Sequence, residues 1–369
     1  MNLLIATDKF KGSLSAPAAC EAIAKGIVQA LPHARIVLAP LADGGEGTLA
    51  LANNWLKGRK ITLQASDPLG RLTTASYHYN QDTQTALIEM AQASGLMLLP
   101  PEERNCLHTS TYGSGELIAD ALSRGARKVY LAIGGSATCD MACGMAAALG
   151  YRFLDHEGTV LPPFGESLLK IARIDKQQVM PGIAPCQFEV LCDVNNPLYG
   201  PEGAALVFGP QKGASKEECL LLDDCLRHVA TIAQRDLGGE MAQLPGAGAA
   251  GGMGAGCAWF LGAQLVPGID TLLSMMNFAG LCDTADLIIT GEGKVDAQSL
   301  SGKVLSGVIN AAIQAQKPLI AFCGSYDLQP AALQELIAIK TADISLDYAQ
   351  KNAARLLSEA AYTWASKQA

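Results

Sequence analysis

The stretch at residues 285–296, which reads A-D-L-I-I-T-G-E-G-K-V-D, constrains the fold more than any other part of the chain. Its apolar run at 287–289 is typical of a strand buried on both faces, as in a parallel sheet. The turn that follows carries Glu292, Lys294 and Asp296, and its two glycines let backbone N–H groups approach a ligand. In open α/β sheets, ligands bind beyond the carboxyl ends of the strands. We therefore expect a binding site here, and an ordinary strand-to-helix turn with solvated charges is the alternative.

A strand-then-helix rhythm occurs at both ends of the chain and is interrupted in the middle. Apolar runs typical of buried strands lie at 3–7, 36–39, 287–290, 319–323 and 339–344. Three close-spaced runs in the middle are typical of antiparallel strands, at 60–65, 73–79 and 85–90. The sequence predicts a doubly wound five-stranded parallel α/β sheet formed by residues 1–59 and 267–369, with a mixed α/β domain at 60–266 inserted into it.

Composition and charge exclude several classes of protein. The net charge is −8 and no block of Lys and Arg is interleaved with aromatic residues, so we expect no nucleic-acid partner. The 11 cysteines include no C-x-x-C pair, which favours reduced thiols in a cytoplasmic protein over disulfides or a zinc site. The first residues do not resemble a signal peptide. The uncharged stretch at 241–269 is interrupted by glycines and prolines, so we expect no membrane span.

Acidic residues recur in Gly- or Asn-rich turns, mostly after predicted strands: Asp43, Glu46, Asp140, Asp193, Glu292 and Asp296. Mg²⁺ prefers one or two carboxylates together with substrate phosphates. A general base for a hydroxyl needs a single carboxylate within hydrogen-bond reach. Any one of these acids alone is equally well explained as a turn cap. The whole set is better explained by a shared polar cleft.

Two turns have the composition of an anion site. Residues 109–115 read T-S-T-Y-G-S-G and open a predicted helix, where free N–H groups and the helix dipole suit a phosphate. Gly134, Gly135 and Ser136 repeat the pattern before another helix. No P-loop motif occurs. Basic residues accompany the same kind of turn, although a solvated surface charge explains any one lysine taken alone: Lys9, Lys11, Arg71, Lys212, Lys294 and Lys303.

The glycine-rich run at 246–251 matches G-x-G-x-x-G, the pattern of a dinucleotide-binding turn. The match is weak because no apolar strand precedes it, and the segment before it ends in Pro245. A close-packed hinge or a ligand loop explains the run better. A nicotinamide-dependent hydroxy-acid oxidoreductase therefore stays open only as a minor alternative, as does a two-domain solute-binding protein.

Seven motifs spread over the whole chain are long enough to be specific. They are D-K-F-K-G-S-L-S (8–15), L-A-D-G-G-E-G-T (41–48), D-P-L-G-R (67–71), G-G-S-A-T (134–138), C-D-V-N-N-P-L (192–198), G-P-Q-K-G-A (209–214) and T-G-E-G-K-V-D (290–296). Together they resemble the bacterial type-1 glycerate kinase family. One departure is C-D-M-A-C at 139–143, where the family pattern has Asp followed by glycines.

The resemblance implies a flavodoxin-like domain interrupted by a second α/β domain, as the strand pattern also predicts. It implies ATP- and Mg²⁺-dependent phosphorylation of D-glycerate in a cleft between the domains, with 2-phospho-D-glycerate as the product. A kinase that forms the 3-phospho product is the alternative. The expected partners are therefore D-glycerate and ATP, and the oligomeric state is left open.

The resemblance also implies a set of roles. We expect Arg71 to hold the glycerate carboxylate, and Asp193 to accept the hydroxyl proton or to hold Mg²⁺ near it. Lys9, Lys11 and Lys212 are expected to steady phosphate oxygens during transfer. The other expected substrate-binding residues are Asp8, Asn196, Ser136 and Thr111. The expected nucleotide- or phosphate-binding residues are Gly134, Gly135, Gly291, Glu292, Lys294 and Lys303. The expected metal ligands are Asp43, Glu46 and Asp296.

Overall fold

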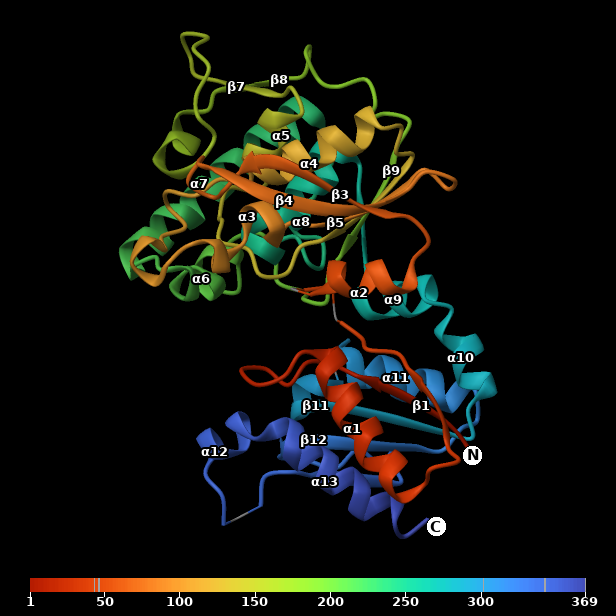
Figure 1. Cartoon of the computed structure of the whole chain (residues 1–369). Coiled ribbons are helices and arrows are strands. Elements are labelled where there is room, and N and C mark those ends of the chain that lie inside the picture. The colour runs from red at the N-terminus through yellow and green to blue at the C-terminus, as the bar shows by residue number, and fades with distance from the viewer. Residues whose placement is uncertain (43, 46, 301, 342, 369) are drawn as a thin grey trace. The chain divides into compact units, whose positions relative to one another are not determined.

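The computed structural model describes residues 1–42, 44–45, 47–300, 302–341 and 343–368. The chain divides into two compact units (Figure 1). Unit 1 consists of Met1–Asp43 together with Gly268–Ala369, and unit 2 consists of Gly44–Pro267.

The sheet of unit 1 has five parallel strands in the order β13-β12-β11-β1-β2. Their bounds are β1 (Asn2–Thr7), β2 (Arg35–Leu38), β11 (Leu287–Val295), β12 (Leu319–Tyr326) and β13 (Glu335–Ala338). Numbered within the unit, this order is 2-1-3-4-5, which is the flavodoxin-like arrangement. The predicted doubly wound five-stranded sheet is confirmed.

Helices cover both faces of this sheet. The helices are α1 (Ala16–Ala30), α9 (Gly268–Met275), α10 (Phe278–Thr284), α11 (Val304–Gln314), α12 (Leu346–Lys351) and α13 (Ala353–Ala365). Leu3 and Ile5 pack with α1 and α13, while Leu4 between them points to the other face and is also buried. α1 and α13 touch closely at Gly26, where a Cβ atom would lie 2.0 Å from the carbonyl oxygen of Ser358.

One predicted strand of unit 1 is misplaced. The apolar pattern suggested a strand at 339–344, whereas β13 is Glu335–Ala338 and pairs with Ile320–Cys323 of β12. Ile339 and Lys340 still donate their N–H groups to the carbonyl oxygens of Cys323 and Gly324, although both lie beyond the strand. β13 reads Glu-Leu-Ile-Ala and lies at the edge of the sheet, so the chain has two adjoining apolar runs here and the earlier one forms the strand.

The sheet of unit 2 has six strands in the order β10-β9-β6-β5-β4-β3. Their bounds are β3 (Arg59–Ser66), β4 (Leu72–Asn80), β5 (Thr85–Glu89), β6 (Lys128–Ala132), β9 (Gln187–Leu191) and β10 (Gln264–Val266). β3, β4 and β5 pair antiparallel, which confirms the predicted meander, and the other neighbouring pairs are parallel. The sheet is therefore mixed.

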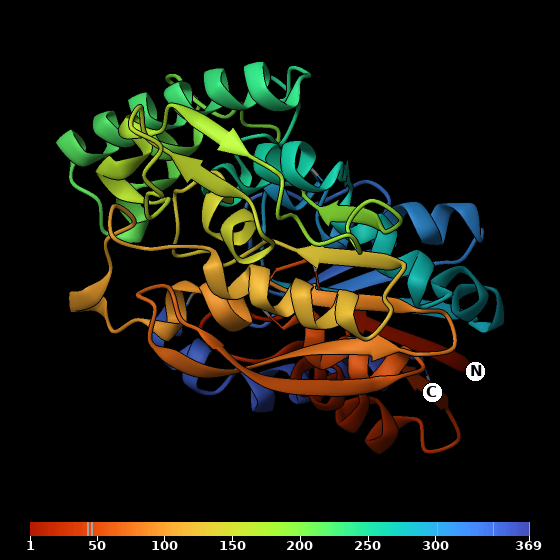
Figure 2. The ribbon, with the colours of Figure 1, turned by 90° about the horizontal axis from the view of Figure 1, so that it is seen from above.

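Helices pack on this sheet, and α4 (Tyr112–Ser123) contacts β3 and β4 (Figure 2). The other helices are α2 (Thr48–Trp55), α3 (Ala91–Ser94), α5 (Cys143–Ala148), α6 (Ala204–Phe208), α7 (Lys216–Leu237) and α8 (Ala249–Leu261). A small separate ribbon is formed by β7 (Arg152–Leu154) and β8 (Arg173–Asp175). In the part of the chain that is described, no helix is both long and apolar enough to cross a bilayer.

α2 belongs to the compact unit 2, although the sequence analysis assigned it to the first domain with a boundary at 59. It packs on β4 and β5. The carboxylate of Glu89, at the end of β5, accepts hydrogen bonds from the backbone N–H groups of Gly47 and Leu49 in its first turn. Glu89 is only 1% exposed, so a buried carboxyl group anchors the start of this helix.

The glycine-rich run at 246–251 is a packing element. A Cβ atom on Gly248 would lie 2.1 Å from the carbonyl oxygen of Pro197, and one on Gly251 would lie 2.0 Å from that of Thr138. Gly251 also has a positive φ of 74°, and the ordinary helix begins only after residue 252. The run therefore lets backbone segments approach one another, as the preferred interpretation of the sequence predicted.

Candidate functional site

The first cluster lies where β1 ends, beside residues 291–293 of the neighbouring strand β11. The turn expected directly after 287–289 is wrong, because β11 continues to Val295 by pairing with β12. Asp8 follows β1, and its N–H group donates to the carbonyl oxygen of Gly291 at 2.9 Å. Gly293 lies against the backbone of Lys11, whose nitrogen would be 3.2 Å from an added Cβ atom. In unit 1 these are the first and third strands, between which the strand order reverses, and flavodoxin-like sheets bind ligands at this point. Asp8, Lys11, Gly291 and Glu292, which the sequence analysis singled out, therefore lie close together.

Glu292 is the most perturbed group of this cluster. Burial raises its pKa to about 7, the charges of Asp8 and Asp296 act in the same direction, and Ser299 and Lys303 oppose them. Its Oε1 atom is buried and has no hydrogen-bond partner among the described residues. A half-buried carboxyl group with an unsatisfied oxygen is suited to bind a donor or a cation.

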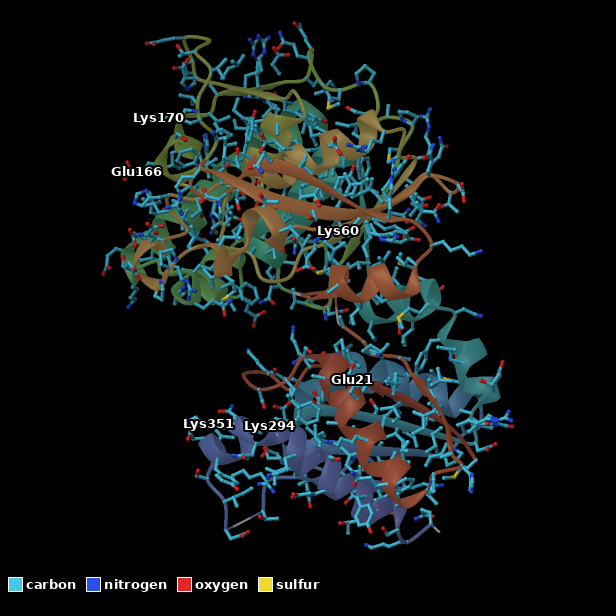
Figure 3. The ribbon with its side chains drawn as sticks, in the orientation of Figure 1. Glu21, Lys60, Glu166, Lys170, Lys294 and Lys351 are labelled. Carbon is cyan, nitrogen blue, oxygen red and sulfur yellow. The ribbon has the colours of Figure 1, made fainter. Side chains whose placement is uncertain are left out.

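The remaining predicted residues of unit 1 are more exposed. Lys294, labelled in Figure 3, forms an ion pair with Asp327 at 2.7 Å, and both side chains are more than half exposed. Lys303 donates to Gln298 Oε1 at 3.3 Å, and Asp296 accepts the N–H of the same glutamine. Lys9 is half-buried and donates its backbone N–H to Asp8. The predicted metal ligands Asp43 and Glu46 lie outside the described residues.

The second cluster surrounds Lys212 in unit 2. Lys212 ends a short 3₁₀ turn, is 3% exposed, and donates from Nζ to Ser136 Oγ at 2.7 Å and to the carbonyl oxygen of Thr138 at 2.8 Å. Burial lowers the pKa of Lys212, and the groups of Cys139, Cys106 and Asp140 oppose that effect. Lys212 and Ser136, which the sequence analysis singled out separately, are therefore in direct contact.

The turn at 109–115 already binds a carboxyl group of the protein itself, that of Asp140. Asp140 Oδ2 accepts from both the N–H and the hydroxyl group of Thr111 at 2.8 Å, and from the N–H of Gly144 at 3.2 Å. The Thr111 hydroxyl also accepts from the N–H of Met145. Thr111 is fully buried, and this position does not favour a direct contact with substrate. The expected contact stays a prediction.

The Gly134-Gly135 turn follows β6 and lies against another glycine turn. A Cβ atom on Gly134 would be 2.6 Å from the Cα atom of Gly45, and Gly135 has a positive φ of 77°. Asp193 and Asn196 follow β9, the neighbour of β6 in the sheet, and both are half-buried. Asn196 donates its side-chain amide to the carbonyl oxygen of Glu202. These residues share the edge at which β6 and β9 end.

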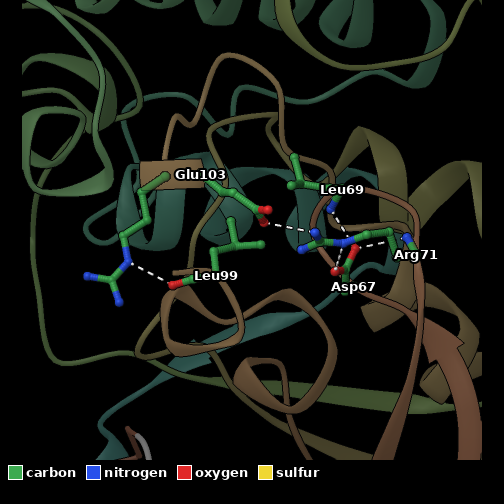
Figure 4. A network of polar contacts seen from close by, with 6 residues as sticks. Asp67, Leu69, Arg71, Leu99 and Glu103 are labelled. Carbon is green, nitrogen blue, oxygen red and sulfur yellow. Dashed lines mark hydrogen bonds and ion pairs between the residues drawn. The ribbon is translucent and has the colours of Figure 1, made fainter. Parts of the chain in front are cut away.

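Arg71 lies in the turn between β3 and β4 and is engaged by two carboxylates (Figure 4). Its Nε donates to Asp67 Oδ2 at 2.7 Å and its Nη1 to Glu103 Oε2 at 2.8 Å. Pro68, in the same turn, accepts the N–H of Ser110, so this turn adjoins the one that holds Thr111. A two-pronged contact of Arg71 with a substrate carboxylate that uses Nη1 would compete with the Glu103 contact.

Two buried residues near the second cluster were not singled out as site residues from the sequence. Glu89 ends an apolar run as its one charged residue, which could have marked it. Asp140 was noted only as one acid among six, because nothing local separates a buried acid from a turn cap. The structure, in contrast, gives both of them backbone N–H partners in the interior.

The fold and the two clusters define a two-unit α/β protein whose first unit is flavodoxin-like. The sequence model of the glycerate kinase family matches residues 3–367, and the chain belongs to this family.

Several relatives are similar over most of their length. A protein of Halalkalibacterium halodurans named glycerate kinase is 45% identical over 364 residues, which is 97% of this chain and 96% of that protein. The glycerate 2-kinase of Escherichia coli K12 is 43% identical over 325 residues, or 88% of this chain and 85% of the relative. A crystal structure from Salmonella typhimurium LT2, described as a candidate glycerate kinase 2, has a TM-score of 0.87 and 41% identity, covering 100% of this chain and 98% of that one.

Proposed function

We propose that this protein transfers the γ-phosphoryl group of ATP to D-glycerate and forms 2-phospho-D-glycerate. Membership of the glycerate kinase family supports the substrates, and the similarity to the E. coli relative supports the 2-position. The single structural observation that carries the proposal is the buried Lys212, held by Ser136 and Thr138 next to the Gly134-Gly135 turn. A buried ammonium group beside a glycine-rich turn is suited to bind phosphate, because it forms strong charge-assisted hydrogen bonds with phosphate oxygens.

Phosphoryl transfer depends mostly on positioning and on stabilising charge at the moving phosphate. Lys212 has three N–H donors and uses two of them for Ser136 and Thr138, which leaves one for a phosphate oxygen. Since Ser136 Oγ accepts from Lys212, its own O–H group is directed elsewhere and serves as a neutral donor. Gly134 and Gly135 supply backbone close to the same place.

The cluster in unit 1 is proposed to bind the nucleotide. Lys9, Lys11, Lys294 and Lys303 supply positive charge for the phosphates, and Gly291 and Glu292 lie within β11 at the switch point between β1 and β11. Lys294 is available for this role because its present pair with Asp327 is exposed and therefore weak.

Mg²⁺ fits the chemistry of the same residues. The described residues contain no group of three metal-ligating side chains, but Mg²⁺ needs only one or two carboxylates in addition to substrate phosphates. Asp296 would hold it in unit 1, and the unsatisfied Oε1 of Glu292 lies in the same cluster. The predicted ligands Asp43 and Glu46 stay predictions, since they lie outside the described residues. When bound, the ion would neutralise charge on the phosphate oxygens.

Glycerate is proposed to bind through Arg71 at its carboxylate, with Asp8, Asn196 and Ser136 as further contacts and Asp193 as the acceptor of the hydroxyl proton. The C2 hydroxyl is one bond from the carboxyl carbon, while the more reactive C3 hydroxyl is two bonds away. A clamp on the carboxylate therefore selects C2 if the phosphate is delivered close to it, because a misplacement of about 1 Å costs on the order of 10²-fold in rate.

The test is incubation with Mg-ATP and D-glycerate, followed by identification of the product by phosphorus NMR. Enolase and pyruvate kinase without phosphoglycerate mutase should convert the product to pyruvate. A requirement for the mutase would identify the 3-isomer and would contradict the proposed clamp. Absence of any phosphorylated product would overturn the kinase assignment itself.

A cytoplasmic location is part of the proposal. All 11 cysteines of the chain are free thiols, and most of them are buried, as expected for a protein kept under reducing conditions. ATP and D-glycerate are the proposed small-molecule partners.

A further inference from the structure

Asp140 is a buried carboxylate that the proposed chemistry does not use. It is 1% exposed, its Oδ2 atom accepts three hydrogen bonds, and its Oδ1 atom is buried with no partner among the described residues. Burial of an ionisable group with an unsatisfied oxygen costs stability. Such a cost at this point suggests that the carboxylate has a role besides filling space.

The three donors to Asp140 come from two different segments. Thr111 precedes α4 and Gly144 lies in the first turn of α5. A second bond joins the same turn to the segment of Asp140, because the hydroxyl group of Thr109 donates to the carbonyl oxygen of Ala137 at 2.9 Å. The segment at 136–140 is therefore fixed to the turn at 109–111 at two points.

The same segment supplies both oxygen atoms that hold Lys212, namely Ser136 Oγ and the carbonyl oxygen of Thr138. Just beyond Asp140, Met141 and Ala142 have positive φ values of 51° and 57°, a conformation that residues other than glycine adopt only with strain. Met141 is held in this bend by its N–H bond to the carbonyl oxygen of Gly251 at 3.1 Å. Strain of this kind persists only where surrounding contacts over-determine the backbone.

We propose that Asp140 is a positioning residue for phosphoryl transfer: by tying the segment at 136–140 to Thr111 and Gly144, it fixes the two oxygen atoms that aim Lys212. The proposal rests on the role of Lys212 proposed above. Asp140 reaches substrate only through Lys212 and is not itself a catalytic residue.

Three ionisable groups act on the pKa of Lys212, namely Cys106, Cys139 and Asp140. All three favour its protonated form, against the effect of burial. Glu218 acts on Cys106 and raises its pKa. Burial raises the pKa of Asp140, while its bonds from Thr111 and Gly144 stabilise the ionised form. Removing the Asp140 carboxylate should therefore lower the pKa of Lys212 further.

The experiment compares Lys212→Met, Asp140→Asn and Asp223→Asn in steady-state kinetics over pH. Asp223 is the matched control, since it is also a buried carboxylate of unit 2 that accepts a backbone N–H, from Gly200, but it lies on α7. Asp140→Asn should lower kcat by about 10-fold or more, with the KM values for both substrates changed much less. It should also move the alkaline limb of the kcat/KM profile to lower pH, whereas Asp223→Asn should leave kcat and that limb unchanged.

The outcomes separate the two proposals. Full activity of Lys212→Met would remove Lys212 from the reaction, and the proposal for Asp140 would fall with it. An inactive Lys212→Met together with an Asp140→Asn whose kcat and alkaline limb match those of Asp223→Asn would overturn the role of Asp140 alone. A purely structural role would lower the folded fraction but would not move the alkaline limb.

If Asp140→Asn does not fold, Thr111→Val provides the test. It removes one of the three bonds to Asp140 Oδ2 and keeps the backbone N–H bond. A kcat several-fold below that of the wild type, with an unchanged KM for glycerate, supports the proposal. An unchanged kcat, or a rise confined to the KM for glycerate, contradicts it.

Discussion

The two clusters of charged residues are built in opposite ways. In unit 2, Lys212, Ser136, Thr111 and Asp140 are at most 6% exposed and are joined by hydrogen bonds before any ligand arrives. In unit 1, Lys294 is 54% exposed and its partner Asp327 is 63% exposed. A buried, prearranged group acts without reorganising, while an exposed one has to be ordered when the ligand binds. The same residue type should therefore matter to different degrees in the two clusters.

The largest contrast is expected between two lysines. Lys212→Met should reduce kcat/KM on the order of 10³-fold, because a preorganised charge is lost from a dry site. Lys294→Met should reduce it by about 10-fold or less, since an exposed ammonium is screened by water. Steady-state kinetics of both variants measures the contrast, with the exposed Lys216→Met as a control for Lys212. If both variants lose kcat/KM to the same extent, the buried lysine is no more important to the reaction than the exposed one, which would contradict the comparison.

The next effect concerns the edge at which β9 ends. Asp193→Asn should lower kcat by about 10²-fold, the usual scale for loss of a general base, with little change in thermal stability. The neighbouring Asn195, which is exposed, provides the control, and Asn195→Ala should retain most of the activity. A near-normal kcat for Asp193→Asn in a folded protein would assign proton transfer to another group.

A smaller effect is expected at Arg71, whose surroundings are intermediate between the two clusters. Arg71→Lys should raise the KM for glycerate several-fold more than that for ATP, because lysine lacks the two-pronged fork. Glu103→Gln should act in the opposite direction, since it weakens the contact that competes for Arg71 Nη1. Equal changes in the KM values for glycerate and ATP would contradict the assignment of Arg71 to glycerate, and would indicate that it binds the nucleotide or has a structural role.

The smallest effect is a pH dependence of stability in unit 1. The pKa of Glu292 is raised from 4.5 to about 7, so the folded state holds an additional proton between these values. The protonated Glu292 therefore contributes fully to the free energy of unfolding below about pH 4.5, and this contribution is lost as the pH rises through 7. Without nucleotide and with EDTA, Glu292→Gln should be more resistant to urea than the wild type at pH 8 and equal to it at pH 4.5. The exposed Glu359→Gln should show no such difference, and a stability gain of Glu292→Gln at both pH values would contradict the assignment.

Sequence reasoning succeeded where a local pattern decides the structure and failed where distant segments do. The buried run at 287–289 and the meander at 60–90 follow from apolar periodicity, which is local. The turn at 109–115 has the composition of a phosphate site, yet Asp140 fills it from 29 residues away. Arg71 looks available in its own motif, but Glu103 engages it from 32 residues away. The spacing of residues within a motif does not predict these contacts, because they join segments that only the folding of the chain brings together.

The departure from the family pattern at 139–143 illustrates the same limit. Glycines were expected after the aspartate, and the left-handed backbone at Met141 and Ala142 is the conformation that glycine adopts without strain. The family motif therefore indicates a backbone conformation that the chain keeps without the glycines. It could not predict that side chains are retained there, because this depends on packing with Gly256, where an added Cβ atom would lie 2.6 Å from that of Ala142.

The pairing of β1 with β11 has a consequence for how the protein is made. Leu3 lies opposite Leu287, while unit 2 is one continuous segment between them. At about 5–20 residues per second, a ribosome needs roughly 15–60 s to synthesise the intervening chain. The apolar first strand therefore emerges long before its partner exists, and the complete sheet of unit 2 is available for folding first. Unit 1 closes only at the end of translation, so a nascent chain that stalls before β11 leaves this strand exposed to aggregation or to chaperones.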